Sequence, residues 1–171
     1  RITWLVAPLS YPVVSTHPCV DSVILFDRKN WKVSLPNALR ELKEKPFDIV
    51  LDLQRIAKSG LFAISANAKR RIGFDKKRCK EMTWLFPFER IPASDPHVHM
   101  LNQYLEFGAY LGLTDLEISW GIPVLGKLPP DLLIDLPESY VVLNIGATKP
   151  AKKWFPGCFA ELSLKIKNTF G

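Results

Sequence analysis

The sequence has 171 residues, of which 47% are hydrophobic, and a formal net charge of +6. This length can bury one hydrophobic core and the start of a second, and no apolar run approaches the roughly 20 residues that a membrane span needs. The three cysteines, Cys19, Cys79 and Cys158, lie far apart and show neither C-x-x-C nor Cys/His ligand spacing. They argue against a disulfide framework or a zinc site and fit a reducing compartment.

Short apolar segments alternate with amphipathic ones along the chain. The segment 2–8 is β-branched and aromatic and ends at a proline, which predicts a strand. Leu35, Leu39 and Leu42 have the spacing of one helix face. In chain order, we expect strands at 2–8, 21–27, 47–54, 70–74 and 140–146, and helices at 35–45, 57–68, 97–112 and 155–167. Because the strands are continuously apolar rather than alternating, the pattern predicts an α/β fold with a doubly wound, mostly parallel sheet covered on both faces.

A proline-rich stretch at 122–139 interrupts this alternation and predicts a linker between two domains. One strand and one helix follow it, and such a pair cannot form a core alone. The sequence opens without Met and stops inside a predicted helix. We therefore expect the chain to be a piece of a longer protein.

Positive charge is concentrated in one run, Lys69–Lys80, with the sequence KRRIGFDKKRCK. The run holds seven cations and one carboxylate, Asp75, so that its net charge equals that of the whole chain. Such a concentration of positive charge favours an anionic partner. A solvated surface with no ligand remains the alternative explanation.

Polar or cationic side chains follow three of the predicted strands, at the edge where doubly wound sheets bind ligands. They are Gln54, Arg55 and Lys58 after the third strand, Asp75 with the basic run after the fourth, and Thr148, Lys149, Lys152 and Lys153 after the fifth. In the last group, small residues precede the lysines and a predicted helix follows them. A close backbone approach, a hydroxyl donor, a helix N-terminus and a cation together would form a pyrophosphate cradle. An ordinary solvated loop is the competing interpretation.

Several familiar motifs are absent from the sequence. It contains no G-x-G-x-x-G, no P-loop, no G-x-S-x-G elbow and no Asp-x-Asp that could chelate a metal–nucleotide. His97 and His99 lie two residues apart without an evident ligand partner. We favour a capping or surface role for both histidines at the start of their helix over a catalytic one.

Four segments, taken in order, resemble the bacterial heptosyltransferases of lipopolysaccharide core assembly, which form glycosyltransferase family 9. They are FDIVLDLQRIAKSGLFA, AKRRIGFDKKRCKEMTWLF, HMLNQYLEFGAYLGL and YVVLNIGATKPAKKWFPGCFAEL. The resemblance implies two Rossmann-like domains in the GT-B arrangement. It further implies ADP-heptose as donor, the Kdo–lipid A inner core as acceptor, and an inverting displacement without metal or other cofactor.

The resemblance also implies domain boundaries, roles for individual residues and a cellular location. The acceptor-side domain would be 1–121, lacking the family's first strand, and 140–171 would be the start of a truncated donor-nucleotide domain. The donor phosphates would be held by Thr148 and Lys152, and the acceptor by Lys58, Arg71, Asp75 and Lys80. The catalytic base would lie upstream of Arg1, so we assign none within this chain. The implied location is cytoplasmic, with peripheral contact at the inner membrane surface left open, and no nucleic acid is expected.

Three positions depart from the family pattern. Arg55 stands where the family has a glycine, which predicts crowding of the cleft, and Lys80 replaces an arginine and loses its bidentate geometry. Phe155 is inserted between Trp154 and Pro156. The alternative function is a non-catalytic α/β module that binds a phosphorylated sugar or another anionic ligand. A nucleic-acid binder would interleave aromatic residues with its cations, and the basic run has only Phe74.

Overall fold

The computed structural model describes residues 1–122, 140–147 and 149–170. The chain divides into two compact units, Arg1–Leu125 and Gly126–Gly171, and each is treated by itself. The predicted linker at 122–139 falls outside the described residues except for Ile122. None of the described helices is long and apolar enough to cross a membrane.

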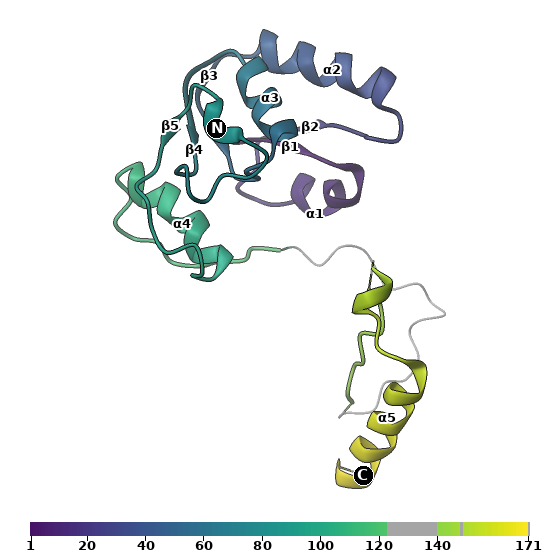
Figure 1. The fold of residues 1–171 in the computed structure, drawn as a ribbon. Helices are drawn as coiled ribbons and strands as arrows, with labels where there is room; N and C mark the ends of the chain where they lie inside the picture. Colours follow the sequence, from purple (N-terminus) through teal and green to yellow (C-terminus); the bar gives the residue numbers. More distant parts are fainter. Residues whose placement is uncertain (123–139, 148, 171) are drawn as a thin grey trace. The chain divides into compact units, whose positions relative to one another are not determined.

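The first unit alternates strands and helices as the sequence predicts (Figure 1). Every strand and helix predicted before residue 122 is present. The elements are β1 (Thr3–Val6), the 3₁₀ helix η1 (Pro8–Ser10), α1 (Tyr11–Ser15), β2 (Ser22–Leu25), α2 (Trp31–Glu44), β3 (Phe47–Asp52), α3 (Ala57–Ser65), β4 (Ala68–Gly73), η2 (Thr83–Leu85), β5 (Glu89–Arg90) and α4 (Met100–Tyr110). The short elements η1, α1, η2 and β5 were not predicted, because segments of two to five residues carry too little periodicity to be recognised.

All strand pairs in the described residues are parallel, as predicted, but they form two sheets rather than one. β1 pairs with β2, and β3, β4 and β5 form a separate sheet in that order. Coverage of both faces is incomplete, since Ile49 and Leu51 of β3 are 36% and 39% exposed, whereas Ile72 of β4, the register partner of Leu51, is buried. A continuously apolar strand does not reveal how many of its faces are covered, because the pattern records composition and not neighbours.

Two hydrophobic clusters hold the first unit together. One joins Ile24 of β2 to Ala38 and Leu42 of α2 and to Phe62 and Ala66 at the end of α3. The other joins Ile72, Phe74 and Ile91, from β4 and the segments that follow β4 and β5, to Phe107 of α4. The second cluster places α4 against the carboxyl ends of the strands, where the predicted ligand-binding residues lie.

The described residues of the second unit form one α-helix, one 3₁₀ helix and no strand. Residues 140–147 have no regular secondary structure, so the predicted strand at 140–146 is wrong. Most apolar side chains of this segment are exposed, with Val142 at 77%. A strand needs a neighbour to satisfy its backbone and cover its side chains, and the described residues of this unit provide none. The predicted helix is confirmed as α5 (Pro156–Phe170), which follows the 3₁₀ helix η4 (Pro150–Lys152) and begins at a proline, a residue favoured in the first helical position.

Candidate functional site

The candidate site lies at the carboxyl ends of β3 and β4. Asp52 and Gly73 are partners in the parallel register, so the loops that leave the two strands emerge side by side. The loops are tied together at the backbone, because the Arg55 carbonyl accepts from the Lys80 N–H at 3.0 Å and from the Thr83 hydroxyl at 3.3 Å. Thr83 is 1% exposed and anchors the second loop.

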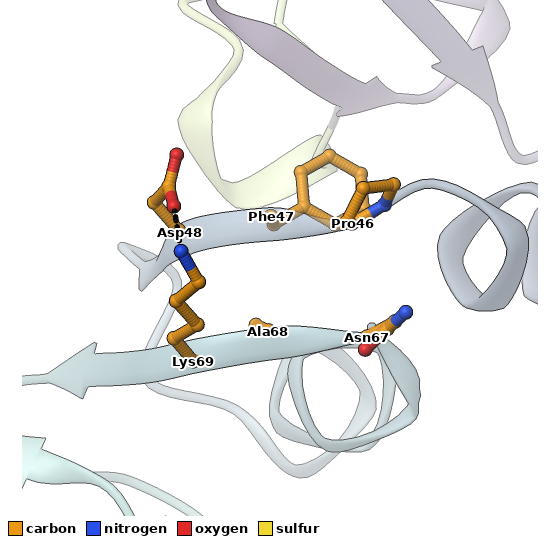
Figure 2. Close-up of a pocket in the computed structure, with 6 residues that line it drawn as sticks. All are labelled: Pro46, Phe47, Asp48, Asn67, Ala68 and Lys69. Atoms are coloured by element: carbon orange, nitrogen blue, oxygen red, sulfur yellow. Dashed lines mark hydrogen bonds and ion pairs between the residues drawn. The ribbon is translucent and has the colours of Figure 1, made fainter.

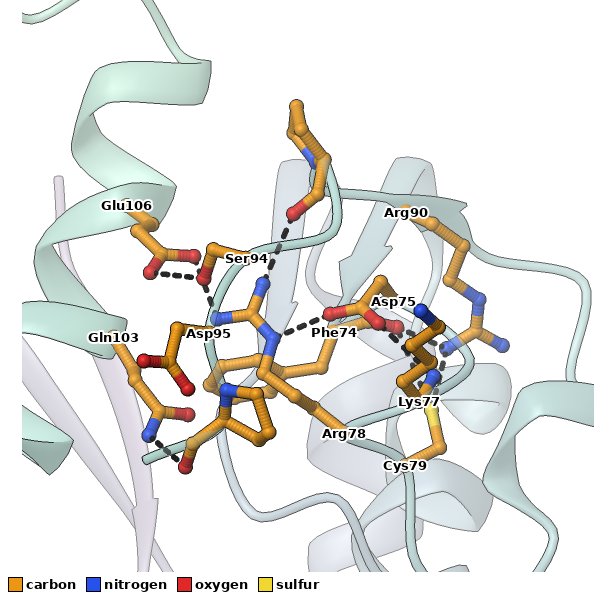
Figure 3. Close-up of polar contacts among 12 residues, drawn as sticks. Phe74, Asp75, Lys77, Arg78, Cys79, Arg90, Ser94, Asp95, Gln103 and Glu106 are labelled. Carbon is orange, nitrogen blue, oxygen red and sulfur yellow. Dashed lines mark hydrogen bonds and ion pairs between the residues drawn. The ribbon is translucent and has the colours of Figure 1, made fainter. Parts of the chain in front are cut away.

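A buried arginine organises the loop after β4. Figure 3 shows the Arg78 guanidinium between Asp75 and Glu106 of α4. It pairs with Asp75 through Nε and with Glu106 through Nη1 at 2.6 Å, and its third donor reaches the Pro92 carbonyl at 3.0 Å. Burial lowers the pKa of this guanidinium, but the hydrogen bonds that it donates to both carboxylates, together with their negative charges, outweigh burial and leave the pKa raised. Arg78 therefore remains charged and ties the loop to α4.

The buried ring of Phe74, the residue directly after β4, contacts two guanidinium groups. The Arg55 and Arg78 guanidinium carbons lie 5.0 and 4.9 Å from its centroid, and Phe107 of α4 packs against it edge to face at 4.9 Å. Cation–π contacts of this length are favourable and orient both cations. Phe74, the only aromatic in the basic run, is therefore a packing element rather than a stacking platform.

Arg55 occupies a backbone conformation that suits glycine. Its φ is 64°, in the left-handed region where a side chain adds strain. That finding gives a physical reason for the glycine that the resemblance places here. The Arg55 side chain reaches the Gln103 carboxamide at 3.4 Å and the Met100 sulfur at 3.3 Å, so the added bulk lies against α4.

The basic run is not a uniform field of free charge. Four of its seven cations form ion pairs or hydrogen bonds with other residues of the chain. Lys69 pairs with Asp48 at 2.8 Å, Arg70 with Glu89 at 2.7 Å, Arg78 with Asp75 and Glu106, and Arg71 with four backbone carbonyls. Within the described residues, the ion pairs include none of the other three, Lys76, Lys77 and Lys80, and all three are exposed.

Arg71 is directed into the end of α3. Its guanidinium donates to the carbonyls of Ala63 at 2.9 Å, Ala66 at 2.6 Å, Ala68 at 3.1 Å and Ile64 at 3.4 Å. These carbonyls include the last ones of the helix, which lack partners within it. The acceptor-binding role of Arg71 stays a prediction, and its hydrogen bonds favour a structural role.

The other predicted acceptor residues are divided between scaffold and surface. Asp75 is 6% exposed and is held by Arg78 and by the Lys77 N–H at 2.9 Å. Lys58, in the first turn of α3, is exposed and lies 5.8 Å from the Phe26 ring centroid. Lys80 is exposed in the loop after β4. Asp75 thus positions the loop, and the two lysines are accessible to a ligand.

On the donor side, Thr148 lies outside the described residues. Lys152 is exposed in η4. A mainly apolar hollow of about 520 Å³ lies beside it, lined by Ile145, Pro150, Lys153, Trp154, Phe155, Pro156 and Phe159. Trp154 packs edge to face on Phe159 of α5, with ring centroids 5.0 Å apart, which agrees with a packing role at the helix start. The inserted Phe155 is 77% exposed.

A second hollow, of about 330 Å³, lies at the opposite edge of the β3–β4 pair. Figure 2 shows its lining residues, with the ion pair between Asp48 and Lys69 spanning the two strands. It is formed at the amino ends of both strands, away from the edge where parallel sheets bind ligands. We therefore do not assign the site there.

The histidines at the start of α4 have the local role expected of them. The His99 Nδ1 accepts from the Leu101 N–H at 3.3 Å and caps the helix. His97 is exposed, and its backbone N–H donates to the Asp95 carboxylate at 2.8 Å. Among the described residues, no three His, Cys, Asp or Glu side chains gather closely enough to hold a metal ion.

Sequence reasoning missed Arg78, Gln103 and Glu106 as parts of the site. Arg78 was counted as one cation among seven, and its partner Glu106 lies 28 residues further along the chain. No spacing rule connects two residues so far apart. The available signal is a single acidic residue in a largely apolar helix, and such residues most often face solvent.

Comparisons with known proteins identify the family of the chain. The model of glycosyltransferase family 9 (heptosyltransferase) matches residues 37–170. The chain is 29% identical over 167 residues to the lipopolysaccharide core heptosyltransferase OpsX of Haemophilus influenzae, which covers 95% of this chain and 47% of that protein. The chain thus spans about half the length of this relative. No solved structure matches the chain. Since the family match covers most of the chain, including both strand ends of the candidate site, the chain belongs to glycosyltransferase family 9.

Proposed function

We propose that the intact protein transfers heptose from ADP-heptose to the lipopolysaccharide inner core. The family match over residues 37–170 carries this proposal, and the similarity to a lipopolysaccharide core heptosyltransferase supports the acceptor class. Membership of a glycosyltransferase family makes the protein an enzyme that moves a sugar. The identity of the sugar and of its acceptor is the part that we propose.

The exposed lysines of the candidate site suit a phosphorylated acceptor. Lys58, Lys76, Lys77 and Lys80 lie on the two segments that follow β3 and β4. Exposed ammonium groups bind phosphate as point charges without a fixed geometry. The buried pair of Asp75 and Arg78 holds the loop that carries three of these lysines.

The proposed reaction is an inverting displacement. The acceptor hydroxyl oxygen forms a bond to the anomeric carbon of the donor heptose while the bond from that carbon to the diphosphate breaks. A base takes the hydroxyl proton, and we expect this base upstream of Arg1. Thr148 and Lys152 would stabilise the charge that grows on the departing ADP, and the proposal uses neither a metal ion nor another cofactor.

The domain assignment follows from the same proposal. Residues 1–121 would form the acceptor-side domain of a GT-B enzyme, 122–139 the linker, and 140–171 the start of the donor-nucleotide domain. Because the acceptor is a lipid-linked saccharide, the enzyme would work from the cytoplasmic side at the inner membrane surface.

The test is a transfer assay with the intact protein, ADP-heptose and an inner-core acceptor that lacks heptose. We expect the acceptor mass to increase by one heptose residue and ADP to be released in equal amount. Hydrolysis of the donor without transfer, or transfer to an acceptor stripped of its phosphates with unchanged KM, would contradict the proposed acceptor class. Binding of the acceptor with no transfer at all would favour the alternative of a non-catalytic module.

A further inference from the structure

The loop after β4 presents an apolar surface next to its free lysines. Met82, Trp84 and Leu85 are 62%, 39% and 59% exposed. The Lys76 ammonium lies 4.3 Å from the Trp84 ring centroid, and Lys77 and Lys80 are exposed in the same loop. Exposed side chains of both kinds thus fall within ten consecutive residues, 76–85.

The backbone holds this loop in a defined and strained shape. Glu81 and Met82 are consecutive non-glycine residues with φ of 49° and 58°, a conformation that persists only where surrounding contacts enforce it. The Glu81 carboxylate accepts from the Ala57 N–H at 3.0 Å. Arg90 donates to the carbonyls of Thr83 and Phe86, each at 2.8 Å. The loop is therefore anchored at both ends of η2, while its apolar side chains remain uncovered.

We propose that residues 76–85 form a membrane-docking loop that binds the surface of an anionic phospholipid bilayer. Trp84, Leu85 and Met82 enter the headgroup region, and Lys76, Lys77 and Lys80 contact lipid phosphates. This inference rests on the proposed function in one respect, since that function places the enzyme at the membrane surface and gives the same three lysines to the acceptor. Docking itself requires neither donor nor acceptor and would hold for a different transferred sugar.

The size and composition of the surface favour a bilayer over a protein partner. A stable protein interface buries about 800 Å² on each partner, and three side chains within four residues offer much less. A few inserted apolar side chains combined with lysines are sufficient for reversible binding to anionic membranes. Tryptophan in particular favours the interface between water and lipid. A lysine held over an exposed tryptophan brings both kinds of contact to the same point.

Another segment of the chain offers a matched control. Residues 27–33 and the loop 76–85 have net charges of +2 and +3, and the difference is the buried and paired Arg78. Each segment has three exposed cations, Arg28, Lys29 and Lys32 in the first and Lys76, Lys77 and Lys80 in the second. Trp31 and Val33 are 53% and 69% exposed. Hydrogen bonds from the Lys29 N–H and the Asn30 side chain lower the pKa of Asp27, so this carboxylate stays ionised in the same segment as Trp31. No described lysine or arginine is stacked on Trp31.

The test is co-sedimentation of the full chain with vesicles of phosphatidylethanolamine and phosphatidylglycerol, and with vesicles of phosphatidylcholine alone. We expect binding to the anionic vesicles only. The double variant Trp84→Ser, Leu85→Ser should lower the partition coefficient about tenfold or more. Replacing Lys76, Lys77 and Lys80 with Gln should lower it about fivefold per lysine at low salt. Trp31→Ser combined with Val33→Ser should leave it unchanged.

Several results would overturn the proposal. They are equal binding to both kinds of vesicle, no binding to either, an equal loss in the Trp31 and Val33 control, and a loss that follows the lysines but not Trp84 and Leu85. Circular dichroism reports whether each variant is folded. If the double variant is not, Met82→Asp, at the most exposed of the three apolar positions, must lower binding and Trp84→Phe must retain it. Because these vesicles hold no acceptor, failure here leaves the proposed transfer reaction untouched, and failure of the transfer assay leaves the docking loop untouched.

Discussion

At the scale of single residues, similar side chains in one short run have different roles because their surroundings differ. Arg78 is enclosed and paired twice, Arg71 caps a helix, and Lys76 lies on an exposed tryptophan. Formal charge is equal in all three. The desolvation of each cation and the number of its hydrogen-bond partners decide whether it supports the fold or is accessible to a ligand.

The Arg78→Met variant should be strongly destabilised. It removes the cation from between Asp75 and Glu106, and breaking a buried pair in this way costs about 3–5 kcal/mol. We expect a value near the lower end, because the Glu106 side chain is 28% exposed and can be hydrated. Urea unfolding monitored by circular dichroism measures the change in free energy.

Arg70→Met is the control for this measurement. Arg70 and Glu89 have side chains that are 45% and 38% exposed, and pairs of this kind contribute about 0–1 kcal/mol. An equal loss of unfolding free energy in both variants would show that burial of Arg78 adds nothing.

Replacing Lys152 with Ala in the intact enzyme should lower kcat more than it raises the donor KM. Charge on the diphosphate grows as the glycosidic bond breaks, so a cation there favours the transition state over the bound donor. Loss of such a contact corresponds to about 2–4 kcal/mol, or roughly 30- to 1000-fold in kcat. Steady-state kinetics with varied ADP-heptose separates the two parameters.

Lys149→Ala and Lys153→Ala are the comparisons for Lys152, and both should have much smaller effects. The Lys153 variant is the more informative comparison, because Lys153 lines the hollow beside Trp154. A larger loss of kcat for Lys153 than for Lys152 would transfer the phosphate-binding role to that hollow. Equal and mild losses for all three lysines would mean that the segment is a solvated loop.

At the scale of elements, the parallel pairing of β3 and β4 creates the site. The register that joins Asp52 to Gly73 brings two loops out at the same edge. One loop carries Arg55 and leads into α3 with Lys58, and the other carries the free lysines. The opposite edge has the exposed pair of Lys69 and Asp48, so the basic run extends from one edge of the sheet to the other.

Charge reversal at Lys76, Lys77 and Lys80 in the intact enzyme should raise the acceptor KM and leave the donor KM unchanged. The effect should shrink as salt is added, because exposed charges are screened. Lys69→Glu is the matched control, since Lys69 belongs to the same run but lies in the amino-terminal half of β4. A rise in donor KM with constant acceptor KM would show that this edge does not bind the acceptor.

The Arg71→Ala variant separates a helix-capping role from acceptor binding. It removes hydrogen bonds to four carbonyls around the end of α3. Hydrogen bonds from charged groups contribute about 1.5–3 kcal/mol each, although water can replace part of this at a partly exposed position. We expect a loss of about 2 kcal/mol in urea unfolding and little change in acceptor KM. Unchanged stability with a higher acceptor KM would restore the acceptor role.

At the scale of the whole molecule, the chain spans 47% of the Haemophilus influenzae relative. The resemblance to the family places the catalytic base and the adenine-binding residues outside the matched segments. We therefore expect the 171-residue chain alone to release no ADP from ADP-heptose in the presence of acceptor, while the intact protein does. Turnover by the chain alone would show that the base lies among residues 1–171.

The sequence by itself determined the α/β class, the parallel strands of the first unit, the three long helices before residue 122 and the helix after residue 155. These features depend on local periodicity and on composition, which neighbouring residues carry. It also determined that polar residues follow β3 and β4, because strand ends can be read from the apolar runs. The family resemblance rested on the same ordered segments.

Only the tertiary structure decided which of those polar residues are free. Arg78 and Glu106 are 28 residues apart, and Arg71 donates to carbonyls of a different element. No periodic pattern in the sequence predicts either contact. The strand predicted at 140–146 is not observed for the same physical reason. A strand is stabilised by a neighbouring strand, and its own sequence does not show whether that neighbour is present. Local order follows from neighbours along the chain, whereas accessible charge follows from neighbours in space.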